Sequence, residues 1–187
     1  MGKFRDIVFG RSQVAKANLD NLFAMPSAAI SLEVAANLAS THSAAVCFRA
    51  PSGAAFQSAS IDFKATIAQE SVAVVESTDA LGYSWVTVTA DDLETLTTAI
   101  HGINSTLEDN GFGPSLLCSV FSFTNSTNGK KEYLVYLYKR GTFYPFVPNG
   151  KDTRDNAREL ALQALLKDDL IFESDLERWF ALWGLPL

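Results

Sequence analysis

The residues best suited to metal or acid-base chemistry are few and scattered along the 187-residue chain. It has two histidines, His42 and His101, and two cysteines, Cys47 and Cys118. A zinc site needs His and Cys ligands at short, regular spacings, such as HExxH or paired CxxC motifs, and the sequence has neither. We expect no metal site. A single histidine beside an apolar helical stripe is usually solvated or locally hydrogen-bonded, so His101 is expected to take no part in catalysis.

Motifs for nucleotide binding and nucleophilic catalysis are also missing. The sequence has no GxxxxGK[ST] loop and no GxSxG elbow. The glycines of Gly111-Phe-Gly113 lack the third glycine and the preceding strand of a dinucleotide site, and a helix-ending turn explains them better. We therefore predict no catalytic residue and no cofactor.

Three pairs of adjacent carboxylates remain as candidate acid-base groups. They lie where helices are expected to start or stop, so capping and solvation explain them: Asp91-Asp92, Glu108-Asp109 and Asp168-Asp169. We expect the protein not to be an enzyme. The alternative, an enzyme of unrecognised type, requires a deep pocket in which Lys139, Arg140, Glu108 or His101 converge.

Composition limits the function further. A net charge of -6 and a pI near 4.9 disfavour nucleic-acid binding, which requires clustered Lys and Arg. With 48% hydrophobic residues the chain should fold unaided. No apolar stretch approaches the roughly 18 residues that cross a bilayer, and residues 1–12 lack the apolar core of a secretory signal. A cytoplasmic protein with two buried thiols is expected.

The first half of the chain predicts short helices and strands. Residues 18–24 form a helix capped by Asn18 and stopped before Pro26. The alternation of Ile30, Leu32 and Val34 with polar neighbours predicts a strand over residues 28–36, with residues 45–50 as its partner. Residues 61–68 suit a helix, and 72–75 look extended.

The second half predicts a hairpin between helices. A strand over residues 81–89 leads to a helix capped by Asp91 and ended by Asn110-Gly111. Residues 116–123 and 132–140 pair through Asn128-Gly129, and Pro145 favours an edge position for residues 143–147. The last helix is capped by Asp152 or Thr153 and has the expected apolar face Ala157, Leu160, Ala161, Ala164 and Leu165. The fold class is α+β: one domain, residues 1–187, with an antiparallel sheet of hairpins flanked by helices.

Aromatic residues occupy both faces of the last strands. One face covers the core, and the other must be covered by the tail that carries Trp179, Phe180 and Trp183, or by a protein partner. Coverage by the tail is favoured, and a partner groove is the alternative. The candidate partner-binding residues are Trp85, Tyr133, Tyr136, Tyr138, Phe143, Tyr144, Phe146 and Trp183.

Residues 1–12 predict a short basic amphipathic helix. It could dock on the domain or lie on a membrane surface, where its apolar face would enter the interface and its cations would meet anionic lipid. The candidate membrane-contact residues are Phe4, Ile7, Val8, Phe9, Lys3, Arg5 and Arg11.

Several blocks together resemble one family. They include Asn18-Leu-Asp-Asn-Leu-Phe-Ala-Met-Pro, Gly82-Tyr-Ser-Trp, Asn104-Ser-Thr-Leu-Glu-Asp-Asn-Gly-Phe-Gly-Pro, Tyr136-Leu-Tyr-Lys-Arg-Gly-Thr-Phe-Tyr-Pro-Phe and Asp175-Leu-Glu-Arg-Trp-Phe-Ala-Leu-Trp-Gly. The chain resembles, over nearly its whole length, the phage-shock-protein-A-associated family PspAB of actinobacteria and archaea.

The resemblance implies an accessory role beside phage shock protein A (PspA), an extended helical membrane-stress effector, and carries no catalytic residues. The expected partner is PspA or an associated component; a homodimer and a transient contact with the inner membrane face are further alternatives. The order of elements also resembles the type III secretion chaperone-like fold, a likeness of topology only.

Overall fold

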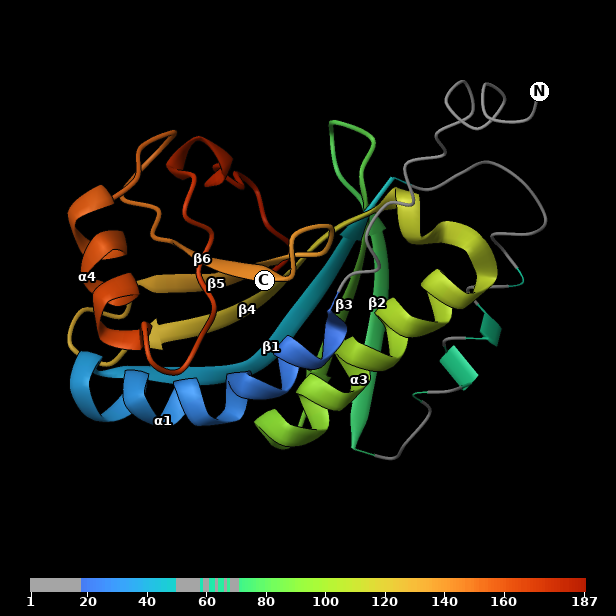
Figure 1. Cartoon of the computed structure of the whole chain (residues 1–187), viewed down its shortest axis with the longest axis horizontal. Helices are drawn as coiled ribbons and strands as arrows, with labels where there is room; N and C mark the ends of the chain where they lie inside the picture. The colour runs from blue at the N-terminus through green and yellow to red at the C-terminus, as the bar shows by residue number, and fades with distance from the viewer. Residues whose placement is uncertain (1–17, 50–57, 59–60, 63, 66, 68–70) are drawn as a thin grey trace, which may run out of the picture.

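A computed structural model describes residues 18–49, 58, 61–62, 64–65, 67 and 71–187 of the chain (Figure 1). Within these residues six strands form one antiparallel sheet in the order β2-β3-β1-β4-β5-β6. The strands are β1 (Leu38–Phe48), β2 (Val72–Thr78), β3 (Ser84–Ala90), β4 (Leu116–Asn125), β5 (Lys131–Leu137) and β6 (Thr142–Phe146). The α+β class is confirmed. The predicted helix over residues 1–12 lies outside the described residues.

Helices cover one face of the sheet. They are α1 (Met25–Ala36), preceded by the 3-10 helix η1 (Leu19–Ala24), then α3 (Leu93–Leu107) and α4 (Asn156–Leu166) (Figure 1). Side chains alternate along each strand, so Val86, Val88 and Phe121 join the core beneath the helices. Trp85 and Val120 join a second cluster on the opposite face. Trp179 also belongs to this cluster and comes from the chain after α4, residues 167–187, which we call the C-terminal segment. The sheet is therefore the middle layer between helices and the C-terminal segment.

The strand predicted over residues 28–36 is wrong, because these residues belong to helix α1. Pro26 lies in the first turn of that helix, where its missing N–H costs nothing, so it does not end a helix as expected. Ala28, Leu32 and Ala36 are buried at a spacing of four, whereas the alternating Ile30 and Val34 are exposed. The expected pairing with residues 45–50 fails with it, since β1 pairs with β3 and β4.

The elements predicted over residues 72–111 are present, with their ends shifted by a few residues. Residues 72–75 lie in β2, and β3 follows a turn at residues 79–83. The N-cap of α3 is Asp92, whose side chain accepts a hydrogen bond from the Thr95 N–H, and not Asp91. Helix α3 ends at Leu107, and Gly111 has a left-handed φ of 85° within the π-turn Glu108–Phe112 that follows it. The β4–β5 hairpin is confirmed, with Gly129 at φ of 71° in its turn.

The beginning and the buried face of the last helix were predicted wrongly. Asp155 caps α4 by accepting a hydrogen bond from the Arg158 N–H, so neither of the expected residues, Asp152 and Thr153, is the cap. The buried residues are Glu159, Leu162 and Leu166. Glu159 fixes this orientation, because its carboxylate accepts hydrogen bonds from Arg154 Nε at 2.9 Å and the Val147 N–H at 2.8 Å. The predicted apolar face consequently points to solvent: Ala157, Leu160, Ala161, Ala164 and Leu165 are all exposed.

The expected edge position of the strand with Pro145 is confirmed, since β6 is the last strand of the sheet. Its outer side is covered by the segment that follows α4. The Phe143 N–H donates to the Ile171 carbonyl, and the Glu173 N–H donates to the Phe143 carbonyl, each at 2.8 Å. These bonds direct the chain from α4 around the edge of the sheet to its second face.

Candidate functional site

The aromatic residues predicted to bind a partner lie mainly inside the molecule. Seven of the eight are at most 7% exposed, and Trp183 is 42% exposed. They also divide between the two faces: Tyr136, Tyr138 and Phe143 pack beneath the helices, whereas Trp85, Tyr133, Tyr144 and Phe146 pack against the C-terminal segment. The favoured expectation, that the tail covers this surface, is confirmed. Three of the eight residues, Trp85, Tyr144 and Trp183, line a pocket beside the tail, and the other five do not line it.

One hydrogen bond and one ring contact attach the C-terminal segment to the sheet, and a hydrogen bond within the segment positions Trp179. The Tyr144 hydroxyl donates to the Phe180 carbonyl, and Trp179 Nε1 donates to the Glu173 carbonyl, both at 3.0 Å. The Trp179 ring stacks on Tyr144 with 6.1 Å between ring centroids. The segment nevertheless leaves part of the sheet face uncovered.

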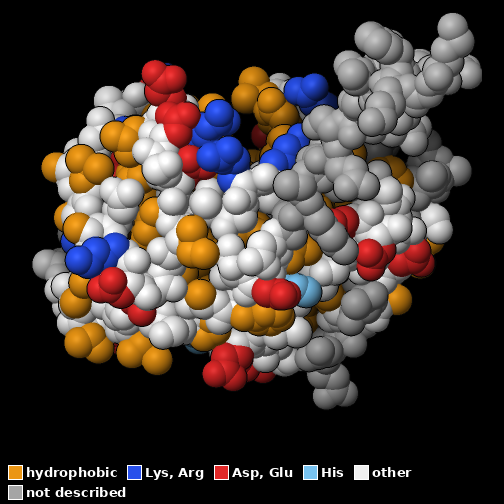
Figure 2. All heavy atoms as spheres, in the orientation of Figure 1, with side chains coloured by type: hydrophobic (Ala, Val, Ile, Leu, Met, Phe, Trp, Pro, Cys, Tyr) orange, Lys and Arg blue, Asp and Glu red, His pale blue; other side chains and the backbone are white. Residues whose placement is uncertain are grey.

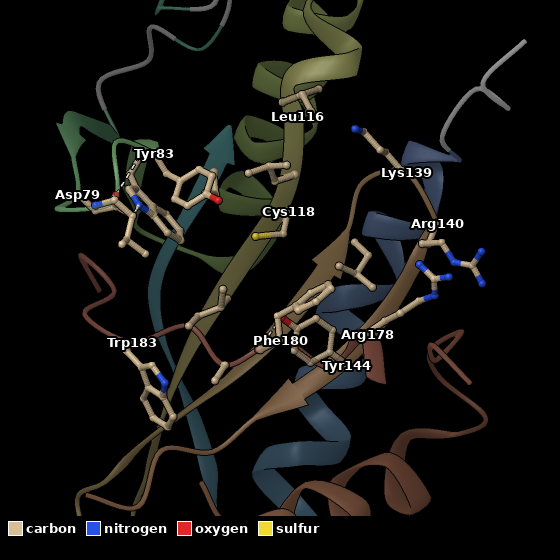
Figure 3. A pocket seen from close by; sticks show the side chains of 17 residues that line it. Asp79, Tyr83, Leu116, Cys118, Lys139, Arg140, Tyr144, Arg178, Phe180 and Trp183 are labelled. Carbon is tan, nitrogen blue, oxygen red and sulfur yellow. Dashed lines mark hydrogen bonds between the residues drawn. The ribbon is translucent and has the colours of Figure 1, made fainter. Parts of the chain in front are cut away.

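A pocket of about 530 Å³ opens between this segment and the sheet (Figure 3). Strands β1, β3 and β4 contribute Cys47, Trp85 and Cys118, and the C-terminal segment contributes Phe180 and Trp183. Most of its lining is apolar, and its size is within the 300–1,000 Å³ common for small-molecule sites. The pocket is a large concave apolar feature of the described part of the chain.

Three cations stand at one side of the pocket: Lys139, Arg140 and Arg178 (Figure 3). Arg140 Nε donates to Glu173 at 2.8 Å, and Arg178 Nε donates to Asp175 at 3.0 Å. No hydrogen bond or ion pair of the Lys139 ammonium occurs within the described residues. Two of the three cations are paired with carboxylates, so the net positive charge of this side comes from Lys139. In the described part of the chain, the N–H groups of Lys139 and of the Arg178 Nη atoms remain available as hydrogen-bond donors.

The opposite side of the pocket carries Asp79 (Figure 3). Burial opposes its ionisation, but hydrogen bonds from Trp85 Nε1 and from the N–H groups of Tyr83, Leu81 and Gly82 outweigh it and lower the pKa of Asp79. Asp79 is thus a carboxylate at neutral pH. It also fixes the Trp85 ring, because the Nε1 donor is only 2.9 Å from its Oδ2.

The two cysteines meet on the pocket wall. Cys47 and Cys118 are register partners on β1 and β4, and both are buried and free. A hydrogen bond to Cys47, together with burial, raises the pKa of the Cys118 thiol. The burial of both residues confirms the predicted buried thiols, and the raised pKa makes Cys118 a poor nucleophile.

A second, polar pocket contains His101 and Glu108. The His101 Nδ1 lies 3.4 Å from Ser105 Oγ, and its Nε2 lies 3.6 Å from Asp20 Oδ1. The order resembles a Ser-His-Asp triad, but both distances exceed the 2.6–3.2 Å of a working nucleophile and base, and the Asp20 side chain is 86% exposed. Lys139 and Arg140 line the other pocket, so the four residues of the enzyme alternative do not converge.

A third feature is an exposed apolar surface on α1 and α4, which we call the α1/α4 face. Ile30 is 66% exposed, Val34 80% and Leu160 47%. The two helices are neighbours, and Arg158 Nη2 donates to the Ala36 carbonyl at 3.0 Å. Figure 2 shows hydrophobic side chains at the surface over both helices, with charged side chains between the two groups. The face consists of Ile30 and Val34 of α1 and Ala157, Leu160, Ala161, Ala164 and Leu165 of α4.

The predictions on membrane contact and metal binding can be compared with the structure only for the described residues. The predicted membrane-contact residues lie outside the described residues: Lys3, Phe4, Arg5, Ile7, Val8, Phe9 and Arg11. Among the described residues no three His, Cys, Asp or Glu side chains are grouped so as to hold a metal ion. No described helix combines the length and the apolar character needed to span a bilayer.

Sequence reasoning identified neither the pocket nor the α1/α4 face. The pocket combines β1, β3 and β4 with a segment some 60 or more residues later in the chain, so no local pattern marks it. A signal for the α1/α4 face was present. Helix α1 carries one charged residue, Glu33, in 12 residues, which is unusual for a helix at the surface.

Comparison with known proteins gives one match. The model of a family described as PspAB, PspA associated protein B, matches residues 1–187. Comparison with curated proteins and with solved structures gives no match. The topological likeness to a type III secretion chaperone therefore stays a prediction.

Proposed function

The chain belongs to the PspA associated protein B family, and on that basis we propose that it is a non-enzymatic accessory protein that binds PspA through the α1/α4 face. The family description supports an association with PspA. The exposed apolar helix surface is the observation that supports this location.

The spacing of the exposed residues suits a helical partner. On α4, Ala157, Leu160, Ala161 and Ala164 repeat at intervals of three and four, the pattern through which one helix packs against another. Small alanines beside Leu160 leave room for the partner's larger side chains. Since PspA is expected to be an extended helical protein, capture of one of its amphipathic helices fits this surface.

Burial of this face would contribute to affinity. Covering apolar surface is favourable by about 25 cal/mol per Å², and the large side chains at the centre of an interface contribute most. Ile30, Val34 and Leu160 are the large exposed members of the face. The smaller alanines provide shape rather than energy.

Substitution of the face provides the test. Ile30→Glu and Leu160→Glu should each weaken binding to purified PspA by about tenfold or more, because a carboxylate would be buried without a partner. Calorimetry or fluorescence anisotropy measures the affinity. Both side chains are largely solvent-exposed, so the fold should be retained, which circular dichroism checks.

Leu176→Glu is the matched control, since Leu176 is 56% exposed but belongs to the C-terminal segment. It should leave PspA binding unchanged. Unchanged affinity of both α1/α4 variants, or a loss only in the control, would contradict the proposed surface. A self-associated form that the α1/α4 substitutions dissociate, without any PspA binding, would identify the face as a homodimer interface and overturn the proposal.

A further inference from the structure

The pocket on the second face of the sheet has a charge arrangement that defines a class of ligand. Its walls are apolar over most of their extent, with Cys118, Tyr144 and Phe180 at the centre (Figure 3). Its two ends have opposite charge, with the three cations on one side and Asp79 on the other. A ligand that fits must combine an apolar body with an anionic group at one end.

The cations can accept such a group without losing their present bonds. Arg178 uses Nε for Asp175, and its Nη groups make no hydrogen bond within the described part of the chain. Arginine has five N–H donors in a planar fork that matches a carboxylate or phosphate. The Lys139 ammonium adds a second positive charge on the same side of the pocket. Asp79 at the other end repels a negative head group and so fixes the orientation of the ligand.

Other ligand classes fit the pocket less well. A soft metal ion would require thiolates, but the pKa of the Cys118 thiol is raised. A nucleotide would require a cradle of backbone N–H groups or a stack of polar contacts, whereas the pocket wall is made mainly of apolar side chains.

We propose that this pocket binds an amphipathic organic anion, with its apolar body over Cys118 and Tyr144 and its anionic head at Lys139 and Arg178. A long-chain carboxylate has this chemistry, and so does an acyl chain of an anionic phospholipid. The site is independent of the proposed PspA interface, because it lies on the opposite face of the sheet from α1 and α4.

Tryptophan fluorescence provides a direct measurement. The chain has three tryptophans; Trp85 and Trp183 line the pocket, and Trp179 stacks on Tyr144. Bromine atoms on an acyl chain quench tryptophan only at short range. Titration of the full chain with dibromostearate should therefore quench its fluorescence saturably, and the neutral methyl ester should bind about tenfold more weakly because it lacks the charge-assisted bonds.

Variants at the positive side distinguish a specific site from general adhesion. Lys139→Gln and Arg178→Gln should together weaken the carboxylate by about tenfold or more, while Lys151→Gln, an exposed lysine away from the pocket, should have no effect. Arg140 is left intact because it neutralises the buried Glu173. Unchanged denaturation curves will show that the variants are folded.

A second arm distinguishes the source of the acyl chain. Vesicles of brominated phosphatidylglycerol replace the free carboxylate, with brominated phosphatidylcholine, which carries no net charge, as the control. Quenching by either anionic probe that depends on Lys139 and Arg178 supports the proposal and identifies the source. Absence of quenching by both anionic probes, equal binding of the methyl ester, or quenching unaffected by the double substitution would overturn it.

Discussion

Two buried glutamates next to arginines differ in the direction of their pKa shifts. Hydrogen bonds from Arg140, together with those from Thr142 and the Asp175 N–H, outweigh burial and lower the pKa of Glu173, which is 1% exposed. For Glu159, burial outweighs the hydrogen bonds from Arg154 and Val147 and raises the pKa. A lowered carboxyl pKa stabilises the fold above the unfolded-state pKa, and this stabilisation is lost as the pH falls through the folded-state value. A raised carboxyl pKa, as for Glu159, instead favours the folded state at low pH, where the carboxyl group is protonated, and disfavours it once the group ionises.

Glu173→Gln should therefore destabilise the protein at neutral pH, and its effect on the free energy of unfolding should be smaller at acidic pH. The change removes charge-assisted hydrogen bonds of a buried carboxylate, and we expect a loss of about 1–3 kcal/mol in the free energy of unfolding at pH 7. Urea denaturation at neutral pH and at about pH 3.5 measures the difference, which should narrow at the lower pH. Glu177→Gln is the control, since Glu177 is exposed. A difference that stays constant with pH would contradict the role of the Glu173 charge.

Elements were predictable where a turn residue defined them, and mispredicted where a local pattern suited two structures or two neighbouring cap residues. The β4–β5 hairpin and the left-handed glycine Gly111 after α3 were correct because Asn-Gly pairs have few alternatives to a turn. The alternation of Ile30, Leu32 and Val34 suggested a half-buried strand with all three side chains on one buried face. In the helix only Leu32 is buried, and Ile30 and Val34 are exposed to solvent. The buried face of α4 depends on Glu159, whose partners Arg154 and Val147 are fixed by tertiary structure. The pocket could not be predicted, since it exists only after the C-terminal segment crosses the sheet.

The corrected start of α4 has a measurable consequence. Asp155→Ala removes the side-chain acceptor for the Arg158 N–H, and it should lower the free energy of unfolding by about 1 kcal/mol. Asp155→Ser should restore most of the loss, because serine also caps helices. Asp152→Asn, at the position first expected to be the cap, should have little effect. Equal losses at both positions in urea denaturation would argue against Asp155 as the cap.

At the scale of the whole molecule, the sheet is covered unequally on its two faces. Helices α1, α3 and α4 pack on one face, whereas the other is covered by a segment with the short 3-10 helix η4 (Leu176–Arg178) as its regular element. Trp179 is the largest buried side chain that this segment contributes, and Arg154 Nη1 donates to its carbonyl. This arrangement places the proposed ligand pocket and the proposed PspA surface on separate layers.

Trp179→Ala should loosen the C-terminal segment. The loss of a buried indole and of its bond to the Glu173 carbonyl is expected to cost about 3–5 kcal/mol of unfolding free energy. Exposure of Tyr144 and Phe146 should increase the binding of a dye such as ANS. Trp183→Ala is the comparison, because Trp183 is 42% exposed and should cost much less. Similar stabilities of the two variants would show that the segment does not depend on Trp179.

The position of β4 in the middle layer has a consequence for the tolerance of the sequence to change. Six consecutive residues of this strand, Cys118–Phe123, are buried, because helices lie on one side of it and the C-terminal segment on the other. In a saturation library, substitutions in β4 should destabilise the fold whether the side chain points to the helices or to the C-terminal segment. Strand β2 lies at the margin of the sheet and should tolerate substitution at most positions. Divergence between relatives should therefore accumulate at the margin and leave the central strand nearly unchanged.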